Sequence, residues 1–206
     1  MKAGVFACLI FSLSLRAGSI TYTDQVVGSG TLGGTAFTNA LVIVTLVGET
    51  GNVVSSPPSV YNTGTATVNV AGIGVATFLD TFAVYVDTSN IPAKAGIADF
   101  ALHNGSLVDT ENTALAAYDL RSAIGPISGC MYLSSAVDPT NMGDFHLTSV
   151  NGNSTFMATT PEPASLILLG IGMAIIAGCA WLRRRATGLY VASDQSLTSP
   201  AASPRP

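Results

Sequence analysis

The segment that decides the fold class is 65–70, which reads Thr65-Ala66-Thr67-Val68-Asn69-Val70 and alternates with a period of two. This period places successive side chains on opposite faces of an extended chain, as in a β-strand. The same alternation occurs at 20–23, whereas 41–47 is an unbroken run rich in β-branched residues, typical of a strand buried on both faces. The sequence therefore predicts a β-rich domain.

Turn signals divide the rest of this region into further strands, which are predicted at 75–79, 81–86, 97–103, 144–150 and 154–159. Glycine and asparagine supply the positive φ that tight hairpins require, and such pairs stand at 33–34, 51–52, 104–105 and 151–152. The pair Asn151-Gly152 is the clearest predicted hairpin. Only 112–124 could be helical, and its apolar spacing leaves the period undecided.

The spacing of these segments predicts the architecture. About eight short strands at intervals of about ten residues, with few helices and no repeats, favour an all-β fold. The expected domain covers 20–159 and is a single antiparallel β-sandwich of Greek-key type. An open Greek-key barrel is the second expectation.

Charged residues are scarce, with 8 Lys and Arg and 12 Asp and Glu among 206 residues. A nucleic-acid-binding protein needs clustered Lys and Arg to displace counterions, so this class is excluded. A hydrophobic content of 48% excludes a wholly disordered chain. Within 20–160 the two bases, Lys94 and Arg121, oppose ten acids, which makes the domain's net charge −8: Asp24, Glu49, Asp80, Asp87, Asp99, Asp109, Glu111, Asp119, Asp138 and Asp144.

The first nineteen residues are predicted to be a secretory signal peptide (1–19). A basic start, Met1-Lys2, precedes the uncharged run 3–15, and small residues follow at 17–19. The run is too short for a spanning helix, which needs about 20 apolar residues. Cleavage after Ala17 or Ser19 would fit, and export implies the secretion translocon as a partner.

The second apolar segment, 164–182, has nineteen residues and no charge. As a helix it would reach about 28 Å, so one transmembrane helix is predicted there. Arg183, Arg184 and Arg185 follow, and cationic flanks stay on the cytoplasmic side. The domain would therefore face outward, and 186–206 would form a disordered cytoplasmic tail.

The sequence before this segment is Pro161-Glu162-Pro163. Two prolines fix φ, withhold N–H donors and favour extended geometry in the residue before each, so this peptide is suited to capture by an enzyme. The order of this motif, an apolar segment and an arginine cluster over 160–185 resembles the PEP-CTERM sorting signal of exported bacterial proteins. In one departure from the family pattern, 21 residues follow the arginine cluster.

The resemblance implies a partner and a location. An exosortase, a membrane enzyme resembling a cysteine transpeptidase, would cleave near the motif in bacteria that make exopolysaccharide. The protein would be anchored in the inner membrane before processing and would afterwards lie at the cell surface or outside the cell.

Candidate chemical residues in the domain are few. Its histidines, His103 and His146, fall in predicted strands and are interpreted as strand residues rather than as bases or metal ligands. Its one cysteine, Cys130, is predicted to be a small buried hydrophobe and permits no internal disulfide, since Cys8 and Cys179 lie in the signal and membrane segments. No nucleophile elbow, phosphate loop or zinc motif occurs, so no catalytic residue, metal or cofactor is predicted.

Two weaker patterns remain. The stretch 138–144 places three oxygen ligands in a glycine-containing loop that Ca²⁺ could use, but its spacing misses the EF-hand pattern and a plain turn is favoured. The tripeptides 104–106 and 153–155 match the N-glycosylation acceptor and are interpreted as accidental in a bacterial chain.

Two function classes compete. The first is an exported, non-catalytic cell-surface or extracellular-matrix protein that touches exopolysaccharide through Thr- and Asn-rich sheet faces. The alternative is an exported carbohydrate-active hydrolase or carbohydrate-binding module. A hydrolase needs two carboxyls about 5–9 Å apart in a cleft, and the domain lacks tryptophan, because Trp181 lies in the predicted membrane segment. The first class is therefore favoured.

Overall fold

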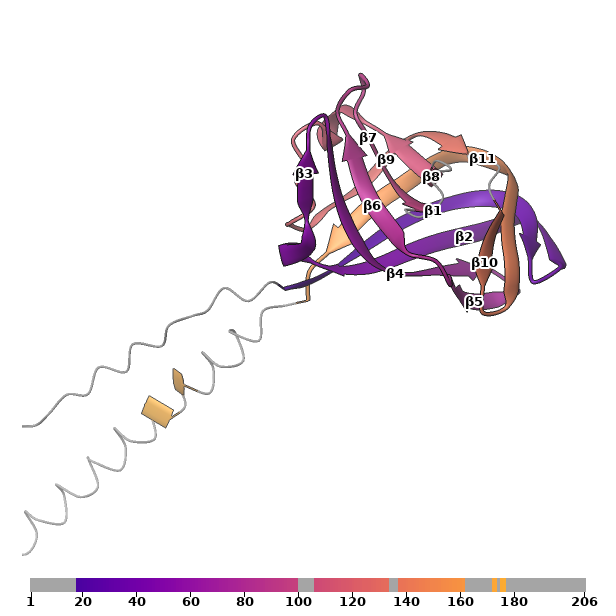
Figure 1. The fold of residues 1–206 in the computed structure, drawn as a ribbon, viewed down its shortest axis with the longest axis horizontal. Helices are drawn as coiled ribbons and strands as arrows, with labels where there is room; N and C mark the ends of the chain where they lie inside the picture. Colours follow the sequence, from indigo (N-terminus) through magenta and orange to yellow (C-terminus); the bar gives the residue numbers. More distant parts are fainter. Residues whose placement is uncertain (1–17, 100–105, 134–136, 162–171, 174, 177–206) are drawn as a thin grey trace, which may run out of the picture. The chain divides into compact units, whose positions relative to one another are not determined.

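The computed structural model describes residues 18–99, 106–133, 137–161, 172–173 and 175–176 (Figure 1). The chain divides into two compact units, Met1–Pro161 and Glu162–Pro206. The strands of the first unit are β1 (Ser19–Leu32), β2 (Thr35–Glu49), β3 (Val54–Ser56), β4 (Ser59–Val70), β5 (Gly74–Thr77), β6 (Phe82–Asp87), β7 (Lys94–Asp99), β8 (Ser106–Glu111), β9 (Ile124–Leu133), β10 (Val137–Thr140) and β11 (Gly143–Thr159).

Eight of these strands form a closed antiparallel ring. Their order is β1-β2-β4-β6-β7-β8-β9-β11, and β11 pairs back with β1. The short strands β3 and β5 pair with β4, and β10 pairs with β11. Apart from these additions, ring neighbours follow one another along the chain. The fold is therefore an up-and-down β-barrel.

The all-β class is confirmed, but the predicted Greek-key sandwich is wrong, and so is the open Greek-key barrel. The first and last strands pair with each other from Thr21↔Thr159 to Leu32↔Phe145. The physical reason is strand length: β1, β2 and β11 have 14, 15 and 17 residues. Long, twisted strands can follow the wall of a barrel, and its closure pairs the backbone groups that sheet edges would expose.

The barrel interior is filled with side chains. An eight-stranded barrel is just wide enough for side chains to fill it. Phe78 packs against Phe82, with ring centroids 4.3 Å apart, and meets Phe145 edge-on at 6.0 Å. The largest fully buried side chains include Tyr22, Phe82, Phe145, Phe156, Ile20, Leu32, Leu46, Ile97, Leu115, Leu120 and Leu147.

The run 41–47 is buried on one face, not on both as predicted. Val44 and Leu46 point inward and are buried, whereas Leu41 is 42% exposed and Val47 is 46% exposed. A strand in this barrel wall has one inward face, so the outward apolar residues reflect the preference of strands for β-branched side chains more than burial.

One of the predicted glycine turns is confirmed and another is wrong. Gly33 and Gly34 have φ values of 57° and 77° and connect β1 to β2 in a tight hairpin. By contrast, β11 continues through Asn151-Gly152, where Gly152 has a φ of 78° and the register against β1 shifts. Positive φ serves a β-bulge as well as a turn. The predicted strands 144–150 and 154–159 are therefore two halves of one bulged strand.

The segment that could have been helical, 112–124, contains only the 3₁₀ turn η2 (Thr113–Leu115), so a helix there is wrong. Of the remaining predicted glycine turns, the pair 51–52 lies in another 3₁₀ turn, η1 (Thr50–Asn52). The pair 104–105 lies outside the described residues. Within the part of the chain that the structure describes, no helix is long and apolar enough to cross a membrane. Of the predicted membrane helix 164–182, only 172–173 and 175–176 are described.

Candidate functional site

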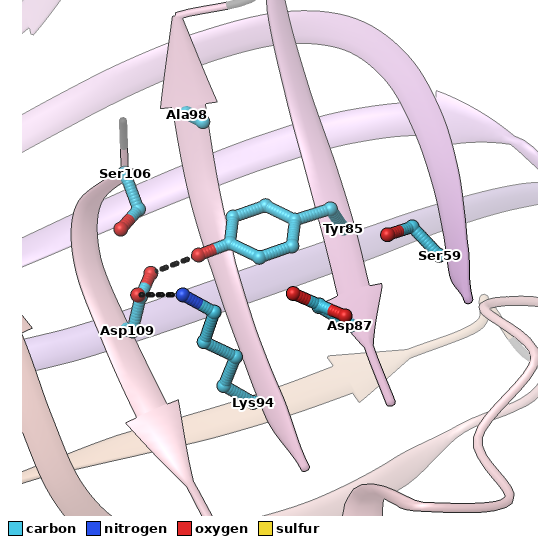
Figure 2. Close-up of a pocket in the computed structure, with 7 residues that line it drawn as sticks. All are labelled: Ser59, Tyr85, Asp87, Lys94, Ala98, Ser106 and Asp109. Atoms are coloured by element: carbon cyan, nitrogen blue, oxygen red, sulfur yellow. Dashed lines mark hydrogen bonds and ion pairs between the residues drawn. The ribbon is translucent and has the colours of Figure 1, made fainter. Parts of the chain in front are cut away.

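The described surface holds a cavity of about 250 Å³ over β6, β7 and β8 (Figure 2). The inward residues of these strands, such as Val84 and Ile97, are fully buried in the core, so the cavity lies on the outside of the barrel wall. All but one of its lining residues have a polar group in the side chain, although apolar atoms make up more of the cavity wall than polar ones; the lining residues are Ser59, Tyr85, Asp87, Lys94, Ala98, Ser106 and Asp109.

A glycine brings the central pair of this site together. The register aligns Tyr85 of β6, Gly96 of β7 and Asp109 of β8 in one row across the wall. Because Gly96 has no side chain, the Tyr85 hydroxyl reaches across β7 and donates a hydrogen bond to Asp109 Oδ1 (Figure 2). A Cβ atom at Gly96 would collide with this carboxylate and with the Val108 carbonyl.

The carboxyl of Asp109 is buried beneath its own partners. Lys94 Nζ lies 3.7 Å from Asp109 Oδ2, and the side chain of Asp109 has no solvent exposure. Burial raises the pKa of Asp109, and hydrogen bonds from Ser106 and Tyr85, together with the charge of Lys94, oppose that rise. The pKa of Tyr85 is also raised, first by burial and then by the charge of Asp109. Each group is thus held in place by the others.

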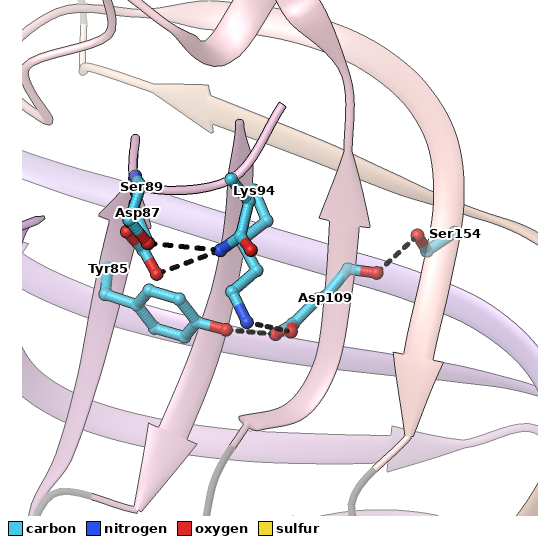
Figure 3. A network of polar contacts seen from close by, with 7 residues as sticks. Tyr85, Asp87, Ser89, Lys94, Asp109 and Ser154 are labelled. Atoms are coloured by element: carbon cyan, nitrogen blue, oxygen red, sulfur yellow. Dashed lines mark hydrogen bonds and ion pairs between the residues drawn. The ribbon is translucent and has the colours of Figure 1, made fainter. Parts of the chain in front are cut away.

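The backbone of Asp109 connects this outer cluster to a polar group inside the barrel (Figure 3). Ser154 Oγ donates to the Asp109 carbonyl at 2.9 Å. Thr110, the next residue along β8, points inward, and its Oγ1 lies 2.7 Å from Ser154 Oγ and 3.3 Å from Asp24 Oδ1. One strand therefore presents Asp109 to the outside and Thr110 to the inside.

Asp24 is the acidic member of this buried group. Burial raises the pKa of Asp24 well above its ordinary value, with a further rise from the charge of Asp109. The Thr110 hydroxyl, which donates to Asp24 Oδ1, opposes that rise.

The polar groups of this site interact mainly with one another. The hydroxyl of Tyr85 and the ammonium of Lys94 both point to Asp109, so their strongest interactions are already made within the cluster. Asp87, which is half-buried, also lines the cavity. Such a cavity could accept a small polar group of a ligand.

The structure separates the residues that sequence analysis considered for chemistry. His146 is half-buried on β11 and pairs with Val137 and Thr31, away from the cavity lining, and His103 lies outside the described residues. Cys130 is exposed on β9 opposite Glu111, so its prediction as a buried hydrophobe is wrong.

The stretch 138–144 forms the tight hairpin between β10 and β11. Asn141 uses its side-chain oxygen to accept a hydrogen bond from Thr77 N at 2.9 Å, while Asp144 is exposed. Asp138 is buried with 1% exposure, and both of its carboxylate oxygens lack a hydrogen-bond partner. Among the described residues, no group of three or more His, Cys, Asp and Glu side chains is arranged to hold a metal ion.

Sequence analysis did not identify the residues of the cavity. Tyr85, Gly96 and Asp109 are far apart in the chain, and only strand register brings them together. One signal was available: a lone glycine inside a strand marks a close approach of another group. Gly96 fits this signal and lies two residues after Lys94, one of only two bases in 20–160.

Replacing Gly96 by valine is expected to lower the unfolding free energy by about 1–3 kcal/mol, because the new side chain forces Asp109 and the β8 backbone away. Ala98→Val is the matched control, since Ala98 lies on the same strand and borders the open cavity. Thermal unfolding of the full chain in detergent micelles, followed by circular dichroism, measures both. Equal midpoints for the two variants would show that the Tyr85–Asp109 contact does not depend on Gly96.

Beyond the barrel, the predicted sorting residues continue from the end of β11. Pro161 is exposed and is the last described residue of the first unit, whereas Glu162, Pro163 and the cluster Arg183, Arg184 and Arg185 lie outside the described residues. Residues 1–17 of the predicted signal peptide also lie outside them.

Comparison with known proteins identifies one segment of the chain. The model of the PEP-CTERM protein-sorting motif matches residues 159–185. No curated protein and no solved structure matches the chain. The match confirms the resemblance over 160–185. The chain therefore carries a PEP-CTERM sorting motif, which begins in the sequence where β11 ends.

Proposed function

We propose that this protein is an exported, non-catalytic cell-surface or extracellular-matrix protein, and that the barrel is the cargo of the sorting motif. The observation that carries the proposal is adjacency: β11 ends at Thr159, and the matched motif begins at the same residue. The motif implies an exosortase-linked sorting system. Processing near it would release a complete barrel.

The start of the barrel is compatible with removal of a signal peptide. Gly18 exchanges hydrogen bonds with Thr50, and Ser19 pairs with Glu49. Of the two predicted cleavage positions, the one after Ala17 preserves these contacts. This choice gives an exported barrel with all of β1 intact.

A non-catalytic role is supported by the contacts of the three reactive side chains in the cavity, Tyr85, Lys94 and Asp109, which are made with one another. Tyr85 and Lys94 both contact Asp109, and these contacts keep the three polar groups next to one another on the outer surface of β6, β7 and β8. A general acid or base must instead reach the reacting group of a substrate. We infer that Asp109 stabilises the barrel wall.

One observation favours the second candidate, a carbohydrate-active hydrolase or carbohydrate-binding module. Two carboxyls, Asp87 and Asp109, line the same cavity, and the pKa of Asp109 is raised, as in a general acid. Release of reducing ends from a polysaccharide, and its loss in Asp109→Asn, would favour this candidate.

Delivery by the motif is tested in a host that contains an exosortase. An epitope inserted after Gly72, an exposed turn with open space around it, reports surface exposure on intact cells. The full chain is expected to be labelled, and a variant with Pro161, Glu162 and Pro163 all replaced by alanine is expected to lose most of its labelling. Asp144→Asn, a change at an exposed barrel carboxylate, is the control. Equal labelling of the triple variant would refute delivery by this motif.

A further inference from the structure

A second surface, distinct from the cavity, covers β11, β1, β2, β4 and β5. Along these strands the inward positions are buried, and the alternate positions point outward. We call sixteen of these outward positions, which lie within 155–159, 21–27, 41–47, 65–69 and 75–77, the threonine face, because half of the sixteen are threonine. Its residues are Thr21, Thr23, Gln25, Val27, Leu41, Ile43, Thr45, Val47, Thr65, Thr67, Asn69, Val75, Thr77, Thr155, Met157 and Thr159.

Strand register orders this face into rows. The central row crosses five strands, and four of its five residues are threonine. Neighbouring strands lie about 4.8 Å apart, and successive outward residues of one strand lie about 7 Å apart, so the hydroxyls and methyl groups repeat in two directions. The central row is Met157, Thr23, Thr45, Thr67 and Thr77, and the next row is Thr159, Thr21, Val47 and Thr65.

The threonine face carries no charged side chain, although the region 20–160 holds ten acids and two bases. Asp24 lies on β1 but points into the barrel, and Glu49 stands one row beyond the face, at the end of β2. Asp144 and His146 point outward at the other end of β11, beyond the sixteen residues of the face. A partner that docks here need not desolvate a charge, which would be costly. A charged partner would find no complementary group. The face therefore selects an uncharged ligand.

The face also combines hydrogen-bonding groups with apolar ones. Val75 is 58% exposed, and Leu41 and Val47 are exposed as well, while the threonines between them are mostly half-buried by their neighbours. Threonine is β-branched and stiff, so little side-chain entropy is lost when a ligand orders it. A sugar ring matches this mixture, because its hydroxyls surround apolar C–H faces.

A protein partner fits less well. Protein interfaces are enriched in aromatic residues, methionine and arginine, and their energetic centres are most often Trp, Tyr or Arg. The threonine face holds one methionine and no aromatic residue or arginine. Strand addition is also blocked at β1, β2 and β11, because each of them is paired on both sides.

We propose that the threonine face binds a neutral polysaccharide, several sugar units at a time. The inference deepens the proposed surface function and rests on it. Each sugar contributes a weak contact, and repetition along the polymer supplies the affinity. Binding should therefore rise with chain length and remain undetectable for single sugars.

The test uses the full chain in detergent micelles, with dextran and cellulose as neutral probes and alginate as the anionic one. Affinity electrophoresis in dextran gels and co-sedimentation with cellulose measure retention. We expect retention by at least one neutral probe, and weaker retention by alginate, which the net charge of −8 on region 20–160 repels. Absence of retention by both neutral probes would overturn the proposal.

Two double variants separate the face from a general effect of charge. Thr45→Glu with Thr67→Glu introduces two charges into the central row and is expected to weaken retention at least tenfold. Thr81→Glu with Thr113→Glu adds the same charge at exposed threonines off the face and is expected to leave retention unchanged. Equal loss in both pairs would contradict the assignment. Thr45→Val with Thr67→Val removes only hydroxyls and is expected to weaken retention severalfold.

Other readouts distinguish failure of this inference from failure of the proposed function. Release of reducing ends from a retained polymer would support binding by the threonine face but refute the proposed non-catalytic role. Delivery to the surface without retention of any polymer would support the proposed surface location but refute binding by the threonine face. Self-association that is lost in the Thr45→Glu, Thr67→Glu variant, without polysaccharide retention, would assign the face to a second copy of the chain and overturn the proposal.

Discussion

Replacing Phe156 by alanine is expected to lower the free energy of unfolding by about 3–5 kcal/mol, the usual cost of truncating a large core side chain. Phe156 is fully buried on β11, the strand that closes the barrel by pairing with both β1 and β9. Its ring meets that of Tyr118 edge-on, with centroids 6.1 Å apart. Urea unfolding of the full chain in micelles, followed by circular dichroism, measures the loss.

The next residue provides the matched control. Met157 lies on the same strand and points outward, so Met157→Ala should cost less than about 1 kcal/mol. If the two variants were equally destabilised, the inward assignment of Phe156 would be wrong. The position of β11 as the strand that closes the barrel would then be contradicted as well.

Acidification from pH 7.5 to pH 4.5 is expected to stabilise the barrel. Burial, together with the charges of Asp99 and Asp80, raises the pKa of Asp138 to about 6. A carboxyl whose pKa is raised on folding binds its proton more tightly in the folded state, so its contribution is present at low pH and is lost as pH rises from 3.8 to about 6. Burial shifts the pKa values of Asp24 and Asp109 in the same direction.

The expected size of this effect is about 1–3 kcal/mol for Asp138 alone, since one pKa unit corresponds to about 1.4 kcal/mol. Asp138→Asn removes a buried charge without hydrogen-bond partners, so it should stabilise the chain at pH 7.5 and flatten the pH dependence. Asp144→Asn, at an exposed carboxylate on the same hairpin, should leave the wild-type profile. A wild-type midpoint that falls on acidification would contradict the burial of these carboxyls.

The sequence predicted the strands whose alternation is strong and missed those whose composition is mixed. The segments 20–23 and 65–70 lie in β1 and β4, where inward and outward residues differ clearly. The missed strands β8 and β9 contain acids, glycine and proline, which lower strand propensity. Their place in the ring is set by pairing with distant strands, which overrides local preference.

Closure could not be predicted, because it depends on register between the two ends of the domain. Asn151-Gly152 has the composition of a hairpin turn, and only the pairing of β11 with β1 identifies it as a bulge. The same limitation applies to the cavity: Asp109 contacts Tyr85 because of the position of Gly96 between them. Local sequence marks Gly96 as a position of close approach, but it does not tell which residues of the neighbouring strands meet there.

The sorting segment, by contrast, was predictable in full. Its signal is a linear order of residue types, two prolines around Glu162, an uncharged run and three arginines, and it needs no tertiary contact. The signal was therefore present in the sequence alone, whereas the role of the barrel depends on surfaces that only the fold assembles.

Mass spectrometry of the native surface-associated protein tests most directly whether the motif delivers the barrel. In a host with an exosortase, the mature form is expected to yield barrel peptides up to β11 and none from 166–183. In the same host without the exosortase, those C-terminal peptides should remain. Peptides from 166–183 on the mature surface form would contradict the account, because the barrel would then reach the surface without processing of its sorting segment.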